Sequence, residues 1–267
     1  MKTAVTLCRV AEAAAGPFVF HNELPIGFAK AAAHGFDAVE LFLPSATAVS
    51  IAEIQELQEK YHLQIAAVGT GAGMVKHGLS LTDADPAIRQ QALDFILALV
   101  DFGGKLGAPA ILGSMQGRSS IAVPHVQAIA FLADALRTIA ARAAIYQVPF
   151  IYEPLNRYET NLFNRVGDAA AFLQQEKLSN VTLLADLFHM NIEETSLAAA
   201  LTENIAHIGH IHFADSNRRA MGFGHTDSRT LYLLLQKIGY SGYLSAEILP
   251  LPTADEAAAQ FIQSTKI

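Results

Sequence analysis

The sequence is poor in cysteine and in basic residues. A single cysteine, Cys8, excludes an internal disulfide framework and every zinc site built from several cysteines, which suits a reducing cytoplasm. Its apolar surroundings predict a buried strand thiol. The chain has 18 Lys and Arg against 25 Asp and Glu, a formal charge of −7. Because no basic stripe is available for counterion release, we expect no nucleic-acid partner.

Long apolar runs are also missing. Residues 92–100 are interrupted by Asp94 and followed by Asp101, whereas a bilayer span needs about 20 predominantly apolar residues. Residues 1–9 hold a short apolar run without a small-residue cleavage pattern, which predicts a strand and not a secretion signal. The sequence therefore predicts no membrane partner and a cytoplasmic location.

What the chain does contain is ample apolar material in an alternating order. Hydrophobic residues make up 52% of the sequence, and 267 residues fit an α/β barrel, which commonly runs to about 250 residues as one domain. Short β-rich runs alternate with longer helical patterns, as in repeated βα units. The helical patterns are clearest at residues 50–61, 86–106, 126–146 and 231–238. The expected strands are residues 3–8, 38–42, 64–68, 110–113, 150–153, 181–186, 208–213 and 243–248.

No linker, low-complexity tract or charge block divides the chain. We therefore predict an α/β fold, a (β/α)8 TIM barrel, with residues 1–267 as a single domain. Glycine-bearing loops follow the third and fourth strands, at residues 69–73 and 113–118. The first completes no G-x-G-x-x-G motif and we expect no helix to open directly on it, so it predicts a turn or a close approach to a ligand.

Polar residues occupy the ends of four consecutive expected strands. Glu153, Asp186, His212 and Glu247 lie at or beside the carboxyl ends of the last four strands, about one βα repeat apart. Each alone is more typical of a helix cap or a loop partner. Because barrel active sites lie at this end, we expect the four side chains to converge. Three carboxylates and one imidazole favour one divalent metal ion, Mn²⁺ or Co²⁺ first, with Mg²⁺, Fe²⁺ and Zn²⁺ as alternatives.

Four motifs carry a resemblance to a known family. They are residues 153–159, 186–191, 212–218 and 246–247. Together they resemble the ketose 3-epimerases of the xylose-isomerase-like barrel superfamily, with the D-tagatose and D-psicose 3-epimerases as the nearest well-known branch. The resemblance covers nearly the whole chain and implies the same four metal ligands. It further implies substrate contacts by Glu159, His189 and Arg218, which otherwise fit a loop salt bridge, a packed histidine and a solvated rim charge.

The resemblance implies an isomerase that inverts C3 of a ketose or keto-sugar acid through a cis-enediolate. Such a reaction needs a base on each face of C3, and Glu153 and Glu247 are the candidates. A divalent metal stabilises the enediolate as a Lewis acid. His189 and Arg218 are expected to hold the C1 and C2 oxygens. By the same resemblance, we expect a homo-oligomer, a dimer or a tetramer.

The substrate and the reaction stay open at this stage. Residues 68–71, 78–82 and 224–227 look similar to 5-keto-L-gluconate epimerases, although the chain departs from them at Gly73-Met74. A carboxylated substrate needs a cation, for which Arg118 or Arg157 is available, and Arg118 equally fits a surface charge. An aldose–ketose isomerase of the hydroxypyruvate type and a non-catalytic, metal-bound sugar sensor are the alternatives.

Two further histidine motifs have structural interpretations. His210 should share the inner face of its strand with His212, and we predict a residue of the barrel core. The His225-x-Asp227 motif is a candidate fragment of a second metal site, but it is more typical of a loop cap or a partner of the metal ligands. Endonucleases of the superfamily with three zinc ions need histidines at the ends of the third and fourth strands. This sequence has none at residues 68–70 and 112–114, so DNA repair is disfavoured.

Overall fold

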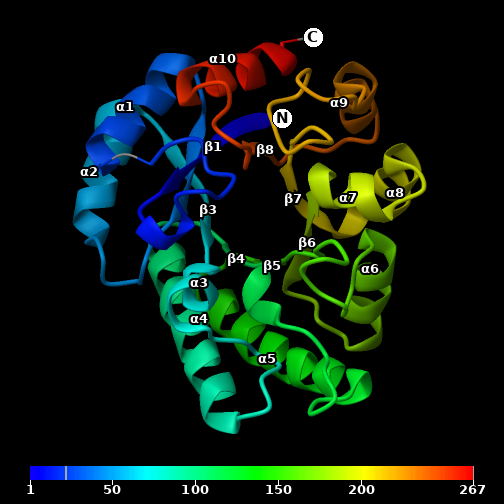
Figure 1. Cartoon of the computed structure of the whole chain (residues 1–267). Helices are drawn as coiled ribbons and strands as arrows, with labels where there is room; N and C mark the ends of the chain where they lie inside the picture. The colour runs from blue at the N-terminus through cyan, green and yellow to red at the C-terminus, as the bar shows by residue number, and fades with distance from the viewer. Residues whose placement is uncertain (22, 267) are drawn as a thin grey trace.

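The computed structural model describes residues 1–21 and 23–266, and within them eight parallel strands close into a barrel in sequence order (Figure 1). The predicted (β/α)8 barrel is confirmed. Four strands end one or two residues before the predicted limit, so that Glu153 and Glu247 directly follow their strands. The strands are β1 (Lys2–Cys8), β2 (Ala38–Phe42), β3 (Gln64–Gly69), β4 (Ala110–Leu112), β5 (Phe150–Tyr152), β6 (Val181–Asp186), β7 (Ile208–His212) and β8 (Tyr243–Ala246).

Helices surround the strands, and several of them begin at a side chain that caps the first turn (Figure 1). Ser50 accepts a hydrogen bond from the Glu53 backbone N–H at the start of α2, and Asp85 followed by Pro86 begins α4. The larger helices are α1 (Leu24–His34), α2 (Ile51–Tyr61), α4 (Pro86–Lys105), α5 (His125–Ile145), α6 (Val166–Gln175), α8 (Leu197–Asn204), α9 (Ser228–Lys237) and α10 (Ala254–Ser264). The shorter ones are α3 (Ala72–His77), α7 (Leu187–Glu193) and the 3₁₀ turns η1 (Ala11–Ala13), η2 (Ser114–Gln116) and η3 (Ile205–His207).

The loop after β3 differs from the prediction. The expectation that no helix opens on the glycines was wrong, because α3 begins at Ala72 with Gly71 as its cap. A Cβ atom on Gly73 would lie 2.6 Å from the Met115 side chain, so the glycine lets this short helix pack closely against η2. Gly78, at φ +65°, ends the helix. Six residues are too few to show a helical period in the sequence.

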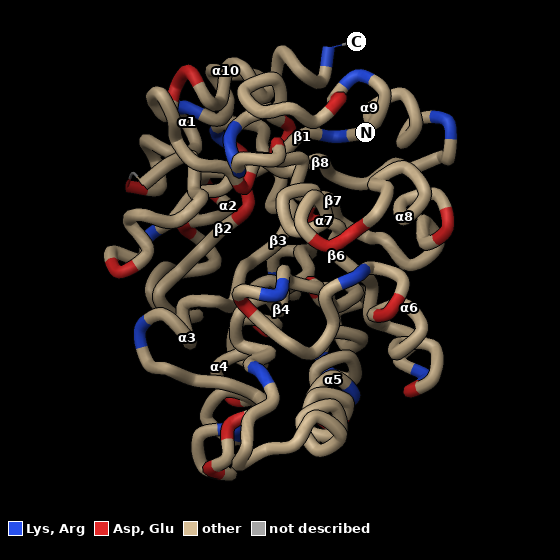
Figure 2. The backbone as a smooth tube through the Cα atoms, turned by 45° about the vertical axis from the view of Figure 1, so that its right-hand side comes forward, with Lys and Arg blue, Asp and Glu red and all other residues tan. Residues whose placement is uncertain are grey.

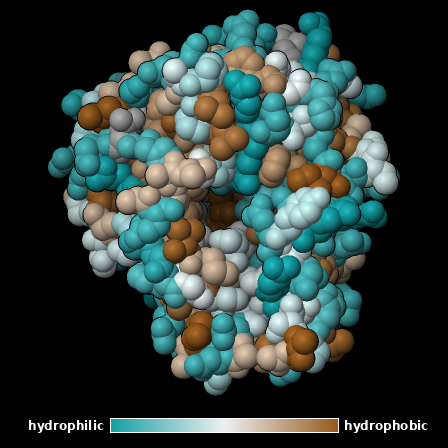
Figure 3. Space-filling model, in the orientation of Figure 1, coloured by the Kyte–Doolittle hydropathy of each residue, from teal (hydrophilic) through white to brown (hydrophobic). Residues whose placement is uncertain are grey.

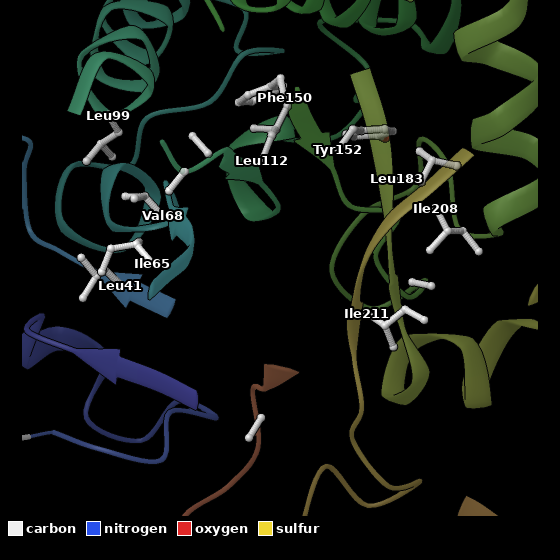
Figure 4. Close-up of a cluster of buried hydrophobic side chains, with 14 of the residues drawn as sticks. Leu41, Ile65, Val68, Leu99, Leu112, Phe150, Tyr152, Leu183, Ile208 and Ile211 are labelled. Carbon is white, nitrogen blue, oxygen red and sulfur yellow. The ribbon is translucent and has the colours of Figure 1, made fainter. Parts of the chain in front are cut away.

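The hydrophobic core has an outer and an inner part. Figure 4 shows the outer part, in which strand side chains such as Leu112 and Leu183 pack with helix residues such as Leu99. Inside the barrel, a separate buried cluster takes one residue from each of four strands, namely Ala67, Ile111, Ile151 and Leu184. This filled interior is typical of an eight-stranded barrel, whose ligand sites lie at the carboxyl ends of the strands. No helix among the described residues has the length and apolar character that crossing a bilayer requires.

Candidate active site

A cavity of about 350 Å³ opens at the carboxyl end of the barrel. The space-filling view shows it as a hollow near the centre of this face (Figure 3). Its lining includes Ile111 of the inner core, residues 12–13 and 15–18, and Gly71 and Val75 at α3. Its polar lining is acidic, and it consists of Glu12, Glu40, Thr70, Ser114, Glu153, Glu159, His189, His212, Arg218 and Glu247.

The four residues predicted as metal ligands meet at one point of this cavity. One ligand atom from each of Glu153, Asp186, His212 and Glu247 lies within 4.8 Å of all the others. From His212 Nδ1 the distances are 3.8 Å to Glu153 Oε1, 3.7 Å to Asp186 Oδ2 and 3.5 Å to Glu247 Oε2. Asp186 and His212 end β6 and β7, whereas Glu153 and Glu247 directly follow β5 and β8. The parallel strands therefore bring the four side chains together.

The donor atoms of this cluster fit a bound cation. Glu153 Oε1, Asp186 Oδ2 and His212 Nδ1 are buried and have no hydrogen-bond partner among the described residues. Buried polar atoms are nearly always paired, so three unpaired acceptors around one point call for a ligand that is not part of the chain. Oxygen donors with a single imidazole suit a divalent metal ion.

The charged groups of the cluster shift one another's pKa. Burial raises the pKa of Glu153 well above its usual range, and Glu247 and Asp186 raise it further. Burial alone would lower the pKa of His212, but the Glu40 and Glu247 carboxylates raise it above the usual value. Protons therefore compete with a cation for this site.

His189 presents a neutral donor to the cluster. Its Nδ1 accepts hydrogen bonds from Asn156 Nδ2 at 2.7 Å and from the Asn156 backbone N–H at 3.3 Å. The ring proton is therefore on Nε2, which lies 3.5 Å from Asp186 Oδ2 and 3.8 Å from Glu153 Oε1. Burial lowers the pKa of His189, so the neutral form is favoured.

Arg218 and Glu159 lie beside the same cluster. Arg218 Nη2 donates to Glu247 Oε2 at 2.7 Å, and its guanidinium lies 4.7 Å from the centre of the Phe188 ring. Glu159 Oε1 lies 3.7 Å from Arg218 Nη1 and 3.8 Å from His189 Nδ1. The three residues predicted to contact a substrate are therefore brought together.

The loop that carries Arg218 is organised by Asp215. Arg218 has φ +60°, a left-handed conformation uncommon for a residue other than glycine. The buried Asp215 carboxylate accepts hydrogen bonds at 2.7–3.0 Å from four backbone N–H groups, those of Ser216, Gly222, Gly224 and Thr226. This network fixes the loop in the shape that points Arg218 at Glu247.

The two guanidiniums considered for a carboxylated substrate lie elsewhere. Arg118 is exposed and does not line the cavity. Arg157 donates from Nε and Nη2, both at 2.9 Å, to the two carboxylate oxygens of Glu193. Among the described lining residues, Arg218 is thus the sole guanidinium.

The two further histidine motifs have structural roles. His210 lies in the barrel core as predicted. Asp227 of the second motif caps the loop that leads into α9, because its carboxylate accepts a hydrogen bond from the Thr230 backbone N–H. His225 Nδ1 lies 2.9 Å from Ser216 Oγ, outside the cluster.

Glu40 is a buried residue of the site that was not predicted from the sequence. Its carboxylate oxygens lie 2.9 Å from His210 Nε2 and 3.2 Å from His212 Nε2. The signal was present, because Glu40 is the one charged residue in an otherwise apolar expected strand, Ala38–Phe42. The wall formed by Phe18 and Phe42, whose rings stack at 4.5 Å, had no comparable signal.

The family of xylose isomerase-like TIM barrels matches residues 28–265 of this sequence. The chain belongs to this family. A D-psicose 3-epimerase from Ruminiclostridium cellulolyticum is 31% identical over 229 residues, which cover 82% of this chain and 75% of that protein. A 3-dehydro-D-guloside 4-epimerase from Escherichia coli is 37% identical over 116 residues, 43% of this chain and 44% of that protein.

A solved structure agrees with the fold. The crystal structure of a 3-keto-D-glucoside 4-epimerase from E. coli, in its apo form, covers 100% of both chains with a TM-score of 0.82 and 22% sequence identity. The expected family and enzyme class are confirmed, because the chain is a xylose isomerase-like barrel whose relatives are carbohydrate epimerases, enzymes of the isomerase class.

Proposed function

We propose that this chain is a metal-dependent epimerase that inverts the C3 carbon of a ketose through a cis-enediolate. One observation carries the proposal: unpaired, buried donor atoms of Glu153, Asp186 and His212 converge with Glu247 on one point of the cavity. Mn²⁺ or Co²⁺ is the proposed ion. When bound there, it supplies Lewis-acid stabilisation of the negative charge that develops on the substrate's oxygens.

The two glutamates exchange protons with the substrate. A carboxylate on one face of C3 removes the proton, and the electrons of the broken C–H bond move toward the carbonyl oxygen. The other carboxylate, in its acid form, returns a proton to the opposite face. Burial raises the pKa of Glu153, which suits the step in which it holds a proton.

His189 and Arg218 orient the substrate in this proposal. The Nε2–H of His189 has no partner among the described residues and is free to donate to a substrate oxygen. Arg218, held at Glu247 Oε2, offers its remaining N–H groups beside the same point. Glu159 accepts a hydrogen bond from Asn156 at 3.2 Å and is available to a sugar hydroxyl. These contacts keep C3 between the two carboxylates.

The charge of the cavity favours a neutral substrate. Five glutamates line it, and Arg218 is already paired with Glu247. A sugar acid would find a single guanidinium among the described lining residues, Arg218, whose charge is already balanced by Glu247, since Arg118 and Arg157 lie elsewhere. We therefore propose a neutral ketose as the substrate, in preference to a keto-sugar acid.

A second candidate is 4-epimerisation of a 3-keto-glycoside. The E. coli 3-dehydro-D-guloside 4-epimerase has a higher local identity, 37%, than the D-psicose 3-epimerase, and C4 is likewise adjacent to a C3 ketone. The stacked Phe18 and Phe42 rings on the cavity wall would suit the apolar face of a glycosidic substituent. The same metal site and bases would serve this reaction.

The experiment is proton NMR in D₂O with Mn²⁺-loaded protein and with chelator-stripped protein as the control, with the paramagnetic ion removed before spectra are recorded. The substrates are D-fructose, D-tagatose, L-ribulose, 5-keto-L-gluconate and methyl 3-keto-glucoside. Deuterium at C3 with inversion of a ketose is the expected result. Deuterium at C4 of the glycoside would favour the second candidate. Label at C1 with an aldose product would replace both by an isomerase, and binding without any label would indicate a sugar sensor.

A further inference from the structure

Glu40 and His210 are buried groups that the proposed chemistry does not use. Glu40 is 4% exposed and His210 is 1% exposed. They belong to β2 and β7, which are not neighbours in the barrel because β1 and β8 lie between them. Their contact therefore crosses the barrel interior, beside the imidazole ring of His212. A carboxylate buried at this depth needs strong partners to stay charged.

The hydrogen bonds define which ring nitrogens carry protons. Glu40 Oε1 lies 3.2 Å from His212 Nε2, and Oε2 lies 2.9 Å from His210 Nε2. A carboxylate accepts hydrogen bonds, so both rings donate from Nε2. The remaining nitrogen of His212, Nδ1, has no partner among the described residues and faces Glu153, Asp186 and Glu247 at 3.5–3.8 Å.

A second metal ion is the alternative explanation of this cluster, since Glu40, His210 and His212 also bring three ligand atoms within 4.8 Å of one another. Hydrogen bonds already account for it. Each carboxylate oxygen has its own imidazole donor, and none of the facing atoms is left unpaired among the described residues. His212 Nδ1, on the other side of its ring, is a buried atom without a partner among the described residues.

We propose that Glu40 is the positioning residue of the metal centre: it holds His212 in the tautomer that leaves Nδ1 free for the cation. His210 occupies the second oxygen and prevents the carboxylate from rotating away. A carboxylate behind a metal-bound imidazole orients the ring and makes it a better ligand. This inference rests on the proposed function, because it assumes that a cation binds at His212 Nδ1.

The first test measures Mn²⁺ binding to metal-stripped protein by titration calorimetry. Glu40→Ala should retain the circular dichroism and cooperative unfolding of the wild type but bind Mn²⁺ about 10–100-fold more weakly. The Mn²⁺ affinity of Glu40→Gln should lie between those of the wild type and of Glu40→Ala, because the glutamine amide has one acceptor oxygen for two imidazole rings. Asp101→Asn is the control, since it neutralises a carboxylate paired with Arg142 on the outer helices, and it should bind as the wild type does.

The second test reads the imidazole directly, in wild-type protein loaded with diamagnetic Zn²⁺. Nitrogen-15 NMR should show the metal on His212 Nδ1 and a protected proton on Nε2, a signature that a merely structural role for Glu40 does not require. Metal on Nε2, two ions per chain, or wild-type Mn²⁺ affinity in both Glu40 variants would overturn the inference. A wild-type protein that binds no divalent ion would instead overturn the proposed function.

Discussion

At the scale of single residues, the cavity concentrates carboxylates that have few partners of opposite charge. The ligand oxygens of Glu153 and Glu247 lie within 4.8 Å of each other, and both residues directly follow a strand. Such an arrangement is costly unless a cation or a proton occupies it. The two neighbouring carboxylates therefore lower the stability of the metal-free protein, and a catalytic role is the expected reason for their presence.

Replacing either glutamate with glutamine removes a base while it keeps the shape of the side chain. We expect Glu153→Gln and Glu247→Gln each to lower turnover by about 10²–10⁴-fold, because general acid–base catalysis contributes about that much. Steady-state kinetics with the substrate found by NMR measures the loss, and circular dichroism shows whether the fold persists. A variant that turns over at the wild-type rate would exclude that residue as a base.

The Asp215 carboxylate controls Arg218 through the backbone. Asp215→Asn leaves one oxygen for four N–H donors, so we expect the free energy of unfolding to fall by about 1–3 kcal/mol and KM to rise. Urea unfolding and kinetics provide the two values. Asp227→Asn is the control, because asparagine caps a helix as well as aspartate does. Equal effects of the two changes would argue against a special role of Asp215.

At the scale of elements, the ends of β4 and β5 are tied together by one side chain. Gln116 of η2 donates to the backbone carbonyls of Gly113 and Glu153 at 3.0 and 2.9 Å, and it accepts from the Tyr152 hydroxyl at 2.7 Å. The glycine-bearing loop after β4 thus sets the position of the first residue after β5. Gly113 of this loop, which has no side chain, also leaves space for the Glu153 carboxylate.

That space predicts the effect of a single methyl group. In Gly113→Ala, the Cβ atom would lie 2.6 Å from Glu153 Oε2, which forces the carboxylate to move. We expect at least about tenfold weaker Mn²⁺ binding, measured by calorimetry on metal-stripped protein. Gly167→Ala in α6 is the matched control, because its Cβ would meet nothing closer than 3.6 Å. Unchanged affinity in Gly113→Ala would mean that Glu153 Oε2 is free to shift.

At the scale of the whole molecule, charge is distributed unevenly between surface and cavity. Figure 2 shows Lys and Arg interleaved with Asp and Glu over the outer elements, without a continuous basic stripe. The cavity, in contrast, holds five glutamates and one arginine among its described lining residues. The excess of acidic groups at one place couples the stability of the barrel to cations and to protons.

Metal and pH should therefore act on stability together. The pKa of Glu153 is raised in the folded state, so its contribution to stability is present below the unfolded value, about 4.3, and is lost as pH rises through the folded pKa. The Glu153→Gln variant lacks this titrating group. As pH rises from 5 to 8, we therefore expect the stability of the metal-free variant to increase relative to that of the metal-free wild type. Thermal unfolding with a chelator measures the difference, and a difference that is constant with pH would contradict it.

A bound ion should reverse this loss for the wild type. Mn²⁺ at about 100 times its Kd stabilises the folded state by about 2.7 kcal/mol, which corresponds to a rise in Tm of about 5–10 °C. At one fixed Mn²⁺ concentration, the rise should be larger at pH 8 than at pH 5, because the ligands must lose their protons to bind the ion. A Tm independent of Mn²⁺ would remove the proposed metal site.

The expected homo-oligomer and the single domain of residues 1–267 stay predictions, and sedimentation equilibrium tests the expected homo-oligomer.

The sequence by itself determined the barrel and the meeting point of Glu153, Asp186, His212 and Glu247. Alternating strand and helix patterns define βα units, and the carboxyl ends of parallel strands converge whatever their loops do. The tertiary structure alone decided the contact of Glu40 with His210 and His212, the helix α3, the Phe18–Phe42 wall and the position of Arg118 outside the cavity. These features depend on barrel closure and on loop paths, which bring together residues with no shared local period.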